Sequence, residues 1–254
     1  MIRVMRPVAE PPALVQQRQT RLTAARAALA EGSKIAFGGY DVAKPALAAM
    51  QHNKCCYCEK LEEQPIYRDV EHFRPKSRYW WLAWTWENLL FACPDCNRQH
   101  KRDAFPLAEE SERLVAETMP PGGERPLLLD PASSACDPWT EIVFRPMRIA
   151  GRERWQPFGT TPRGTTTVEV CRLARPGLLD FYDEHVRMQV RPAVRTALDA
   201  HDSADARGVA EAWRRARRTL LGERKPFRAL SRDAMNHLMG EDLCARYRLE
   251  TAPP

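Results

Sequence analysis

The chain carries, at residues 54–106, the stretch KCCYCEKLEEQPIYRDVEHFRPKSRYWWLAWTWENLLFACPDCNRQHKRDAFP. Two Cys-x-x-Cys pairs mark its ends, Cys55 with Cys58 and Cys93 with Cys96. Four thiolates in two pairs of this spacing are typical of a tetrahedral structural zinc site. Because such a site has no open position for water, we expect the zinc to hold the fold of this stretch rather than to take part in chemistry.

Other cysteines leave some choices open. Cys56 also precedes Cys58, but with one intervening residue, whereas Cys55 leaves the usual gap of two, so we predict Cys55 as the ligand. The alternative to zinc is two unrelated pairs of buried cysteines. The remaining cysteines lie far apart in the sequence and are interpreted as ordinary buried or free thiols: Cys136, Cys171 and Cys244.

Between and just after the two pairs lie residues whose types suit hydrolysis. His72 is the candidate general base, because an imidazole titrates near neutral pH and can take a proton from water. The Glu71 carboxylate and the Asn97 amide oxygen are candidate ligands for magnesium or manganese, which prefer oxygen donors. Asn88 could hydrogen-bond the backbone near His72 and hold the base in place. The alternative is that Glu71 and His72 are an ordinary surface or hydrogen-bonded pair.

The geometry of the Glu-His pair poses a question that the sequence leaves open. In an extended strand, Glu71 and His72 would point to opposite sides. We expect a hairpin or a bulge at this point to turn both side chains toward one cleft. His100, shortly after Asn97, is a further candidate ligand of lower rank, and the alternative is an ordinary surface residue on the final helix of the stretch.

Length and composition limit the class of protein. The chain has 254 residues, enough for one large domain or two small ones with a real core. Its net charge of +6 suits a polyanionic partner, although basic proteins without such a partner are common. No apolar run follows Met1 and no stretch is long enough to span a membrane, so we expect no membrane association and a cytoplasmic location. In that reducing compartment, paired cysteines favour metal over disulfides.

Four regions follow from the patterning, and the chain reads as mainly helical. Residues 1–53 predict helices at 13–30 and 45–53, and residues 54–106 are the cysteine-bracketed module. Residues 107–166 predict a linker with short strands at 127–131 and 141–145 and a loop at 151–165. Residues 167–254 predict about three helical segments. The predicted fold class is therefore α+β, with helices around one small module.

Basic and aromatic residues offer further candidates, each with a plainer alternative. Arg74 and Lys76 follow the candidate base closely and could contact phosphate. The aromatic run at 79–86 could stack on bases, but core packing is the favoured interpretation. The basic stretch at 214–218 could bind DNA or a protein, and a solvated helix face is the default.

At this point a resemblance becomes specific. The Glu71-His72 pair, Asn88 and the Cys93–Asn97 segment resemble the HNH endonuclease motif of the ββα-metal fold. The resemblance implies that His72 activates water, that Asn88 positions His72, and that Glu71 and Asn97 hold a divalent ion. The third position of the motif is Asn here rather than His, a variant that the family also uses. The implied fold is a zinc-stapled ββα-metal nuclease module.

A closer resemblance covers about residues 44–190. The segments that carry it are similar to those of PtuB-type HNH proteins: Cys55–Cys58, Glu71–Lys76, Cys96–Arg98, Phe105–Leu107, Leu127–Pro131, Arg163–Val168 and Leu173–Arg175. Proteins of this type serve in Septu and retron-linked antiphage systems, beside an ABC-type ATPase called PtuA. The resemblance implies a nuclease effector that cleaves DNA with magnesium or manganese and has such an ATPase as its partner.

Two other functions compete with this interpretation. The first is a zinc-dependent DNA-binding module that does not cleave, and the presence of Glu71, His72 and Asn97 argues against it, because binding alone needs none of them. The second is a structural or regulatory subunit of an ATPase complex. The helical region after residue 167 carries no recognisable chemistry, so it is the expected place for such an interface, and this role is compatible with nuclease activity.

Overall fold

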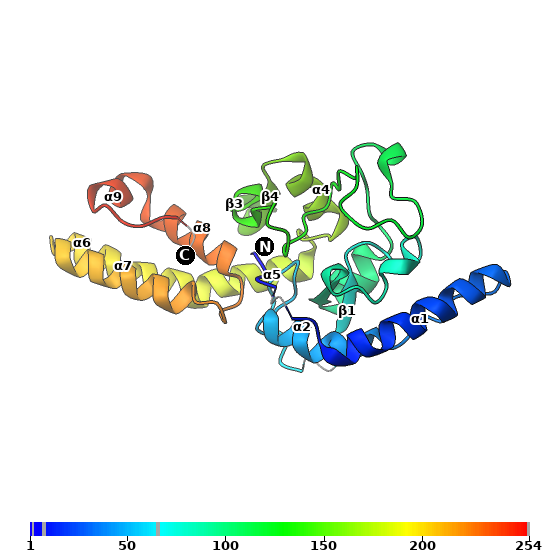
Figure 1. The fold of residues 1–254 in the computed structure, drawn as a ribbon. Helices are drawn as coiled ribbons and strands as arrows, with labels where there is room; N and C mark the ends of the chain where they lie inside the picture. Colours follow the sequence, from blue (N-terminus) through cyan, green and yellow to red (C-terminus); the bar gives the residue numbers. More distant parts are fainter. Residues whose placement is uncertain (2, 7–8, 65–66, 253–254) are drawn as a thin grey trace. The chain divides into compact units, whose positions relative to one another are not determined.

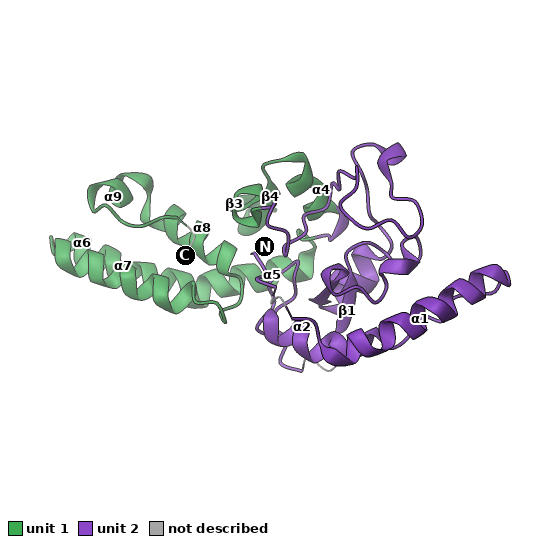
Figure 2. Cartoon of the chain, viewed as in Figure 1, with its two compact units in different colours: residues 1–2, 137–169, 173–254 green, residues 3–136, 170–172 purple. Residues whose placement is uncertain are grey.

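The structure is a computed structural model that describes residues 1, 3–6, 9–64 and 67–252. In this part of the chain, helices and turns accompany two small antiparallel sheets, which confirms the α+β class (Figure 1). The chain divides into two compact units (Figure 2): unit 2, residues 3–136 and 170–172, and unit 1, residues 1–2, 137–169 and 173–254. The four regions drawn from the sequence stay a prediction.

Unit 2 begins with two helices and then forms the cysteine-bracketed module. Its elements, in chain order, are α1 (Pro12–Ala30), η1 (Tyr40–Ala43), α2 (Lys44–Met50), β1 (Asp69–His72), η3 (Trp80–Leu82), η4 (Trp86–Asn88), β2 (Leu89–Ala92), η5 (Asp95–Lys101) and η6 (Glu110–Glu112). The element η5 is a π-helix, and the other η elements of unit 2 are 3-10 helices. Both helices predicted before the module are present, and α2 ends at Met50 rather than Asn53.

The strands β1 and β2 form a small antiparallel sheet whose two faces differ in chemistry. Val70 pairs with Phe91, and Glu71 pairs with Leu90. Since side chains alternate along a strand, Val70, Phe91 and Leu89 lie on one face, and Glu71 and Asp69 lie on the other. The Val70 face packs into a core with apolar residues of both N-terminal helices and the aromatic run: Leu14, Ala25, Leu47, Ala48, Trp84 and Trp86. The opposite face therefore carries the two acidic side chains, whereas His72, opposite Leu89, is on the Val70 side of the strand.

The aromatic run at 79–86 is part of the core of unit 2. Tyr79, Trp81, Trp84 and Trp86 are buried. The indole Nε1 of Trp84 donates to the Gly38 carbonyl oxygen at 2.8 Å. Core packing, the favoured interpretation of this run, is therefore confirmed for these four rings.

The segment after the module is irregular, and the strand expected at 127–131 is wrong. Leu128 and Leu129 are buried, but the described backbone here forms no strand. The Leu127 amide donates to the Pro106 carbonyl oxygen at 2.9 Å, next to an isolated bridge between Leu107 and Pro126. A short apolar run shows that residues are buried, but it does not distinguish a strand from a buried loop.

Unit 1 contains a β-hairpin and a set of helices. Its elements are α3 (Pro138–Glu141), β3 (Ile142–Ile149), β4 (Arg152–Gly159), α4 (Pro162–Val170), α5 (Pro176–His185), η7 (Val186–Val190), α6 (Arg191–Asp202), α7 (Ala206–Leu220), α8 (Arg228–Met239) and α9 (Glu241–Arg246). The helices after the hairpin are more numerous than the three expected segments and begin at Pro162 rather than at 167. α6 packs on α7, and α8 packs on β3. None of the described helices is long and apolar enough to cross a membrane.

The hairpin of unit 1 corrects two expectations. β3 runs to Ile149, four residues past the predicted end, and β4 occupies positions where a loop was expected. The two strands pair in regular register around a turn at Ala150 and Gly151, both of which have positive φ angles of 48° and 78°. Two turn residues with positive φ favour a tight hairpin. The Gly, Pro and Arg residues of β4 have low strand propensity, so the sequence does not predict this strand. Pairing with β3 stabilises it instead.

The basic stretch at 214–218 lies on α7. Arg214, Arg215 and Arg218 are exposed, as a solvated helix face requires. Arg217 is buried, and its Nη1 donates to the carbonyl oxygens of Glu250 and Ala252 at 3.0 Å each. One arginine of this stretch therefore ties the C-terminal segment to α7, and three remain at the surface.

Candidate functional site

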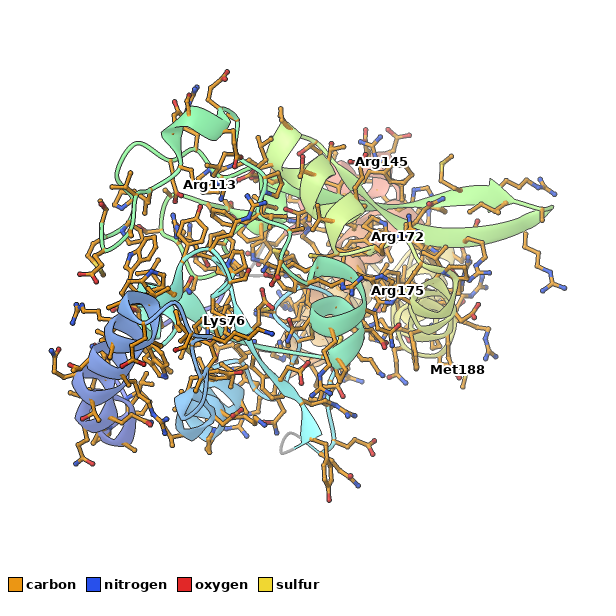
Figure 3. The ribbon with its side chains drawn as sticks, turned by 90° about the vertical axis from the view of Figure 1, so that its right-hand side faces the viewer. Lys76, Arg113, Arg145, Arg172, Arg175 and Met188 are labelled. Carbon is orange, nitrogen blue, oxygen red and sulfur yellow. The ribbon has the colours of Figure 1, made fainter. Side chains whose placement is uncertain are left out.

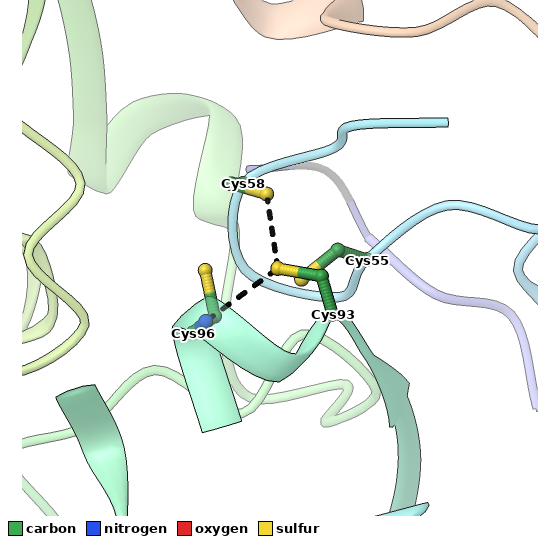
Figure 4. Close-up of side chains that lie close together, drawn as sticks. All are labelled: Cys55, Cys58, Cys93 and Cys96. Atoms are coloured by element: carbon green, nitrogen blue, oxygen red, sulfur yellow. Dashed lines mark hydrogen bonds between the residues drawn. The ribbon is translucent and has the colours of Figure 1, made fainter. Parts of the chain in front are cut away.

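The four cysteines of the two Cys-x-x-Cys pairs come together in unit 2 (Figure 4). Their Sγ atoms all lie within 4.8 Å of one another, and all four residues are buried. Zinc with Zn–S bonds of about 2.3 Å holds its sulfurs about 3.8 Å apart. The Sγ atoms of Cys58 and Cys93 are 3.9 Å apart, so the donor set and its spacing fit zinc.

The cluster joins the elements of the module to one another. Among the described residues, the four cysteines are the one group of three or more His, Cys, Asp or Glu side chains close enough together to hold a metal ion, and Cys56 is not part of it. The Cys56 amide donates to the Phe91 carbonyl oxygen at 3.0 Å, so the first pair is tied to β2. The second pair connects β2 to η5. A zinc ion at this place would therefore hold η5 against the sheet.

A cavity of about 390 Å³ opens beside this module, and three candidate residues line it. These are Glu71, His72 and Asn97; Asn88 is buried and is not among the lining residues. Basic side chains also line the cavity: Lys44, Arg68, Lys76, Arg98 and Arg102. Four acidic residues line it as well: Asp41, Asp69, Glu71 and Asp103. A cavity that combines carboxylates, an imidazole and several cations suits a phosphate ester with a divalent ion better than an apolar ligand.

Glu71 is held by two buried partners. Its Oε1 accepts from the Tyr57 hydroxyl at 3.0 Å and lies 2.7 Å from Nζ of Lys101, whose side chain is 0% exposed. Burial raises the pKa of Glu71, and the nearby Lys101 ammonium and Tyr57 hydroxyl oppose that rise. Both contacts use Oε1, so Oε2 is the oxygen that remains for a divalent ion.

The structure defines which nitrogen of His72 can act as a base. Its Nε2 lies 3.0 Å from the Ala83 carbonyl oxygen, and the Tyr40 ring meets the imidazole edge-on with centroids 4.6 Å apart. A carbonyl oxygen can only accept a hydrogen bond, so Nε2 carries the proton and Nδ1 keeps its lone pair. The near-neutral titration expected from the sequence is not found: burial, and secondarily Lys76 and Lys101, lower the pKa of His72 to about 3, so the ring is neutral at physiological pH.

No bulge brings Glu71 and His72 to the same side. β1 pairs with β2 in regular register over all four of its residues, so the bulge expected in β1 is wrong. His72 is the last residue of β1, and both it and Glu71 nevertheless line the cavity. The end of the strand therefore offers residues from both faces of the sheet to one site.

Asn88 connects the two chain segments that flank His72. Its Oδ1 accepts from the Arg74 amide at 2.8 Å, and its Nδ2 donates to the carbonyl oxygens of Arg74 and Leu82 at 3.0 and 3.2 Å. Leu82 directly precedes Ala83, the residue that holds the imidazole. This geometry suits the expected task of Asn88, which is to hold the backbone around the base.

Asn97 and His100 both lie on η5, but only one lines the cavity. The Asn97 Nδ2 donates to Oδ2 of Asp69 at 3.0 Å, and Asn97 is one of the lining residues. His100 is half-buried and does not line the cavity. The structure therefore brings Glu71 and Asn97 to the same cavity and leaves His100 outside it.

Arg74 and Lys76 differ sharply in what they offer to a ligand. Arg74 Nε donates to Oε2 of Glu124 at 2.8 Å, and neither side chain is more than 11% exposed. A buried, paired guanidinium is not offered to phosphate, which argues against the expected contact by Arg74. Lys76 is partly exposed, lines the cavity and lies over the Tyr40 ring at 5.5 Å (Figure 3).

Four residues of the site were not singled out from the sequence. Tyr40, Tyr57, Asp69 and Lys101 contact His72, Glu71 or Asn97 directly. Asp69 had a usable signal, because it lies two residues before Glu71 and hence on the same face of β1. The signal for Lys101 was hidden, because its place depends on η5 being a π-helix.

Comparisons with known proteins agree with this geometry. Residues 55–103 match the HNH endonuclease family, which defines the class of this module. The chain is also similar to the Septu protein PtuB of Bacillus mycoides (strain KBAB4), with 37% identity over 131 residues, 44% of this chain and 42% of that protein. The Septu protein PtuB of Bacillus thuringiensis is 48% identical over 60 residues, 23% of each chain.

These matches agree with the resemblance to PtuB-type HNH endonucleases that the sequence motifs indicate. The chain spans less than half the length of the curated relatives that it matches. No solved structure matches it.

Proposed function

We propose that this chain is a metal-dependent HNH endonuclease that hydrolyses phosphodiester bonds of DNA. The observation that carries the proposal is the placement of Glu71, His72 and Asn97 around one cavity, beside a four-cysteine cluster that fits zinc. A DNA-binding module that does not cleave would need only the cysteine cluster and the basic side chains that line the cavity. The match of residues 55–103 to HNH endonucleases supports cleavage over binding alone.

His72 would act through Nδ1. With Nε2–H donated to Ala83, the unprotonated Nδ1 takes a proton from a water molecule as the water attacks phosphorus. The Asn88 side chain keeps the backbone on both sides of the base in place. The edge-on Tyr40 ring limits the rotation of the imidazole.

Oε2 of Glu71 and Oδ1 of Asn97 would hold the divalent ion, magnesium or manganese, because carboxylate and amide oxygens are the donors that these ions prefer. Such an ion, when bound, supplies positive charge for a non-bridging phosphate oxygen and for the leaving 3′ oxygen. Lys76 and Arg102 line the same cavity and would bind neighbouring phosphates. The product would carry a 5′ phosphate.

We further propose that the nuclease acts in a Septu defence system with an ABC-type ATPase as its partner, in the cytoplasm. The support is the similarity to two proteins named Septu protein PtuB. Among the described residues, unit 1 contributes none to the cavity, which leaves this unit as the candidate for the partner interface. A regulatory role in an ATPase complex is thus compatible with cleavage.

A cleavage assay on supercoiled plasmid tests the nuclease proposal. We expect the wild type to cut with magnesium or manganese and to be inactive in EDTA. His72→Ala should lower the rate by about 100-fold or more, because it removes the general base. The matched control is His237→Ala, since the His237 ring packs on Trp155 in unit 1.

Two results would count against the proposal. Cleavage by His72→Ala at the wild-type rate would show that His72 is not the base. Binding of DNA by the wild type with no cleavage in either metal, with and without the ATPase, would favour the non-cleaving alternative.

A further inference from the structure

Asp69 lies beside the proposed metal ligands and has two partners on η5. Its Oδ2 accepts from Nδ2 of Asn97 at 3.0 Å, and Nε of Arg98 donates to both carboxylate oxygens at 3.0 and 2.9 Å. Arg98 Nη2 also contacts Oδ1. Asp69 is 6% exposed, whereas the Arg98 side chain is 67% exposed. The carboxylate therefore joins a buried strand to the first turn of η5.

The chemistry of an amide makes the Asp69–Asn97 contact directional. An ionised carboxylate only accepts hydrogen bonds, so the NH₂ end of the Asn97 side chain must face Asp69. The amide oxygen of Asn97 is then turned away from Asp69. A metal ion needs this oxygen and is repelled by the NH₂ end, so one of the two flips of the amide is competent and the other is not.

Asp69 is poorly placed to be a ligand itself. Both of its oxygens are used by Arg98, and one is shared with Asn97. The guanidinium also offsets the negative charge that would attract a cation. Glu71, on the same face of β1, contacts Tyr57 and Lys101 through Oε1, and neither contact uses its Oε2. The two acidic residues of the strand therefore have different tasks.

We infer that Asp69 is a positioning residue that selects the metal-competent flip of the Asn97 amide. This inference rests on the proposed function, because it assumes that Asn97 is a ligand of the divalent ion. Residues that orient metal ligands in this way contribute strongly to affinity, and their loss typically weakens metal binding about 10-fold to 100-fold. Asp69 would thus set the metal affinity of the site without touching the ion.

The test is manganese binding to the purified full chain with its zinc retained, followed by electron paramagnetic resonance of free Mn²⁺. Asp69→Asn should weaken binding by about 10-fold or more, because its amide allows both flips of Asn97. The matched control is Arg98→Gln, which breaks the same ion pair but keeps the Asp69–Asn97 hydrogen bond. We expect this control to bind Mn²⁺ much as the wild type does.

An exchange of the two side chains provides an independent check. In the double variant Asp69→Asn/Asn97→Asp, the amide at 69 can donate to the carboxylate at 97 and leave one oxygen of that carboxylate for the ion. We expect this variant to bind Mn²⁺ more tightly than Asp69→Asn does. If Asp69→Asn loses its zinc or its fold, the inference is tested by the double variant by itself. A folded double variant that does not bind Mn²⁺ overturns the inference.

The outcomes separate the inference from the proposed function. A wild type that binds no Mn²⁺ contradicts the proposed metal site and the inference with it. A wild type that binds and an Asp69→Asn variant that binds equally well overturn the inference alone. If Arg98→Gln tightens binding by the factor by which Asp69→Asn weakens it, Asp69 acts through its charge and not through the orientation of Asn97.

Discussion

The buried pair of Lys101 and Glu71 is the most strongly constrained contact of the site. The two side chains are 0% and 1% exposed, and Lys101 Nζ also donates to the His72 carbonyl oxygen at 2.9 Å. A buried charge that loses its partner destabilises a protein far more than an exposed one does. Nζ of Lys101 therefore holds both the backbone of His72, the proposed base, and the carboxylate of Glu71, the proposed metal ligand.

This pair yields a prediction for Lys101→Met. The variant leaves the Glu71 carboxylate buried beside the Tyr57 hydroxyl and without its ammonium partner, so unfolding by denaturant should require about 3 to 5 kcal/mol less. Magnesium or manganese should restore part of this loss, because the ion would supply the missing positive charge. The control is the double variant Glu71→Gln/Lys101→Met, which removes both charges of the pair. Equal stabilities of the single variant and the wild type would contradict the account.

Single residues also show how far a motif can be extrapolated. Glu71, His72 and Asn97, which were chosen from their spacing in the motif, line one cavity, and their roles stay a prediction. The spacing could not place Lys101. This residue lies four positions after Asn97, and its direction relative to Asn97 differs between a regular α-helix, which the sequence predicts, and the π-helix that η5 forms. Nor could it show that Arg74 is buried, because its partner Glu124 comes from an irregular loop fifty residues further on.

Among the elements, the turns that carry the four-cysteine cluster and η5 depend on each other. η5 is a short helix of seven residues, too short to be stable alone, and its start lies between Cys93 and Cys96. We therefore expect zinc to be a condition for the orientation of Asn97 and Lys101.

Removal of zinc is the corresponding prediction. Cys96→Ser, or treatment of the wild type with a strong chelator, should unfold the module and lower the melting temperature. Metal analysis of the purified chain should give about one zinc per molecule. Cys244→Ser is the matched control, since this buried cysteine lies outside the cluster and the variant should keep its zinc. A folded wild type without zinc would contradict the prediction.

The start of α4 depends on a glycine for a steric reason. A Cβ at Gly164 would lie 1.9 Å from the backbone oxygen of Glu141, at the point where the hairpin meets the helix. The Glu141 backbone cannot change its position as easily as a flexible side chain can, so α4 would have to move away from it. This close approach keeps α4 on unit 1 and explains why a glycine stands inside a helix at some cost in propensity.

Gly164→Ala should therefore destabilise unit 1 by about 1 to 3 kcal/mol, the usual range for forced overpacking. The readout is the free energy of unfolding in urea. Gly177→Ala is the matched control, because a Cβ at this position of α5 would have no atom within 4 Å, and the alanine should be tolerated. Equal effects of the two substitutions would refute the steric explanation.

Elements also show the limits of sequence patterns. The cysteine turns and the helices α1 and α2 follow from local signals, namely cysteine spacing, the apolar residues spaced along α1 and a proline in the first turn of α2. β4 was missed because its stability comes from pairing with β3. The strand expected at 127–131 was wrong for the opposite reason, since its leucines are buried by neighbours in space without any strand to pair with in the described chain.

At the scale of the whole molecule, unit 1 is the part without a chemical task. From the sequence, four apolar residues are candidate anchors for a partner, with the protein's own core as the alternative: Leu178, Leu179, Phe181 and Tyr182. The structure favours the core for three of them, because Leu178, Leu179 and Tyr182 are buried within the chain. Phe181 is 45% exposed on α5, and Met188 on η7 is 53% exposed (Figure 3).

Phe181 on α5 and Met188 on the π-helix η7 are two exposed apolar residues, seven positions apart on the continuous helical run from α5 to α6. Charged, exposed residues flank them: Glu184, Arg187 and Arg191. An apolar centre with a charged rim is the usual composition of a protein interface. Since the proposed ATPase is the expected partner, we predict that this helical run binds it.

The variant Phe181→Arg/Met188→Glu should abolish or strongly weaken co-elution with the co-expressed ATPase in size-exclusion chromatography. Removal of two central apolar anchors costs an interface about 2 kcal/mol or more, which is roughly a 30-fold loss of affinity. The matched control is Met147→Glu, a comparable exposed methionine on β3, 45% exposed. Plasmid cleavage by the isolated double variant should equal that of the isolated wild type, because both residues are remote in sequence from the cavity and do not line it. Undiminished co-elution would show that the ATPase binds elsewhere, and loss with the control variant as well would show that the hairpin belongs to the same interface.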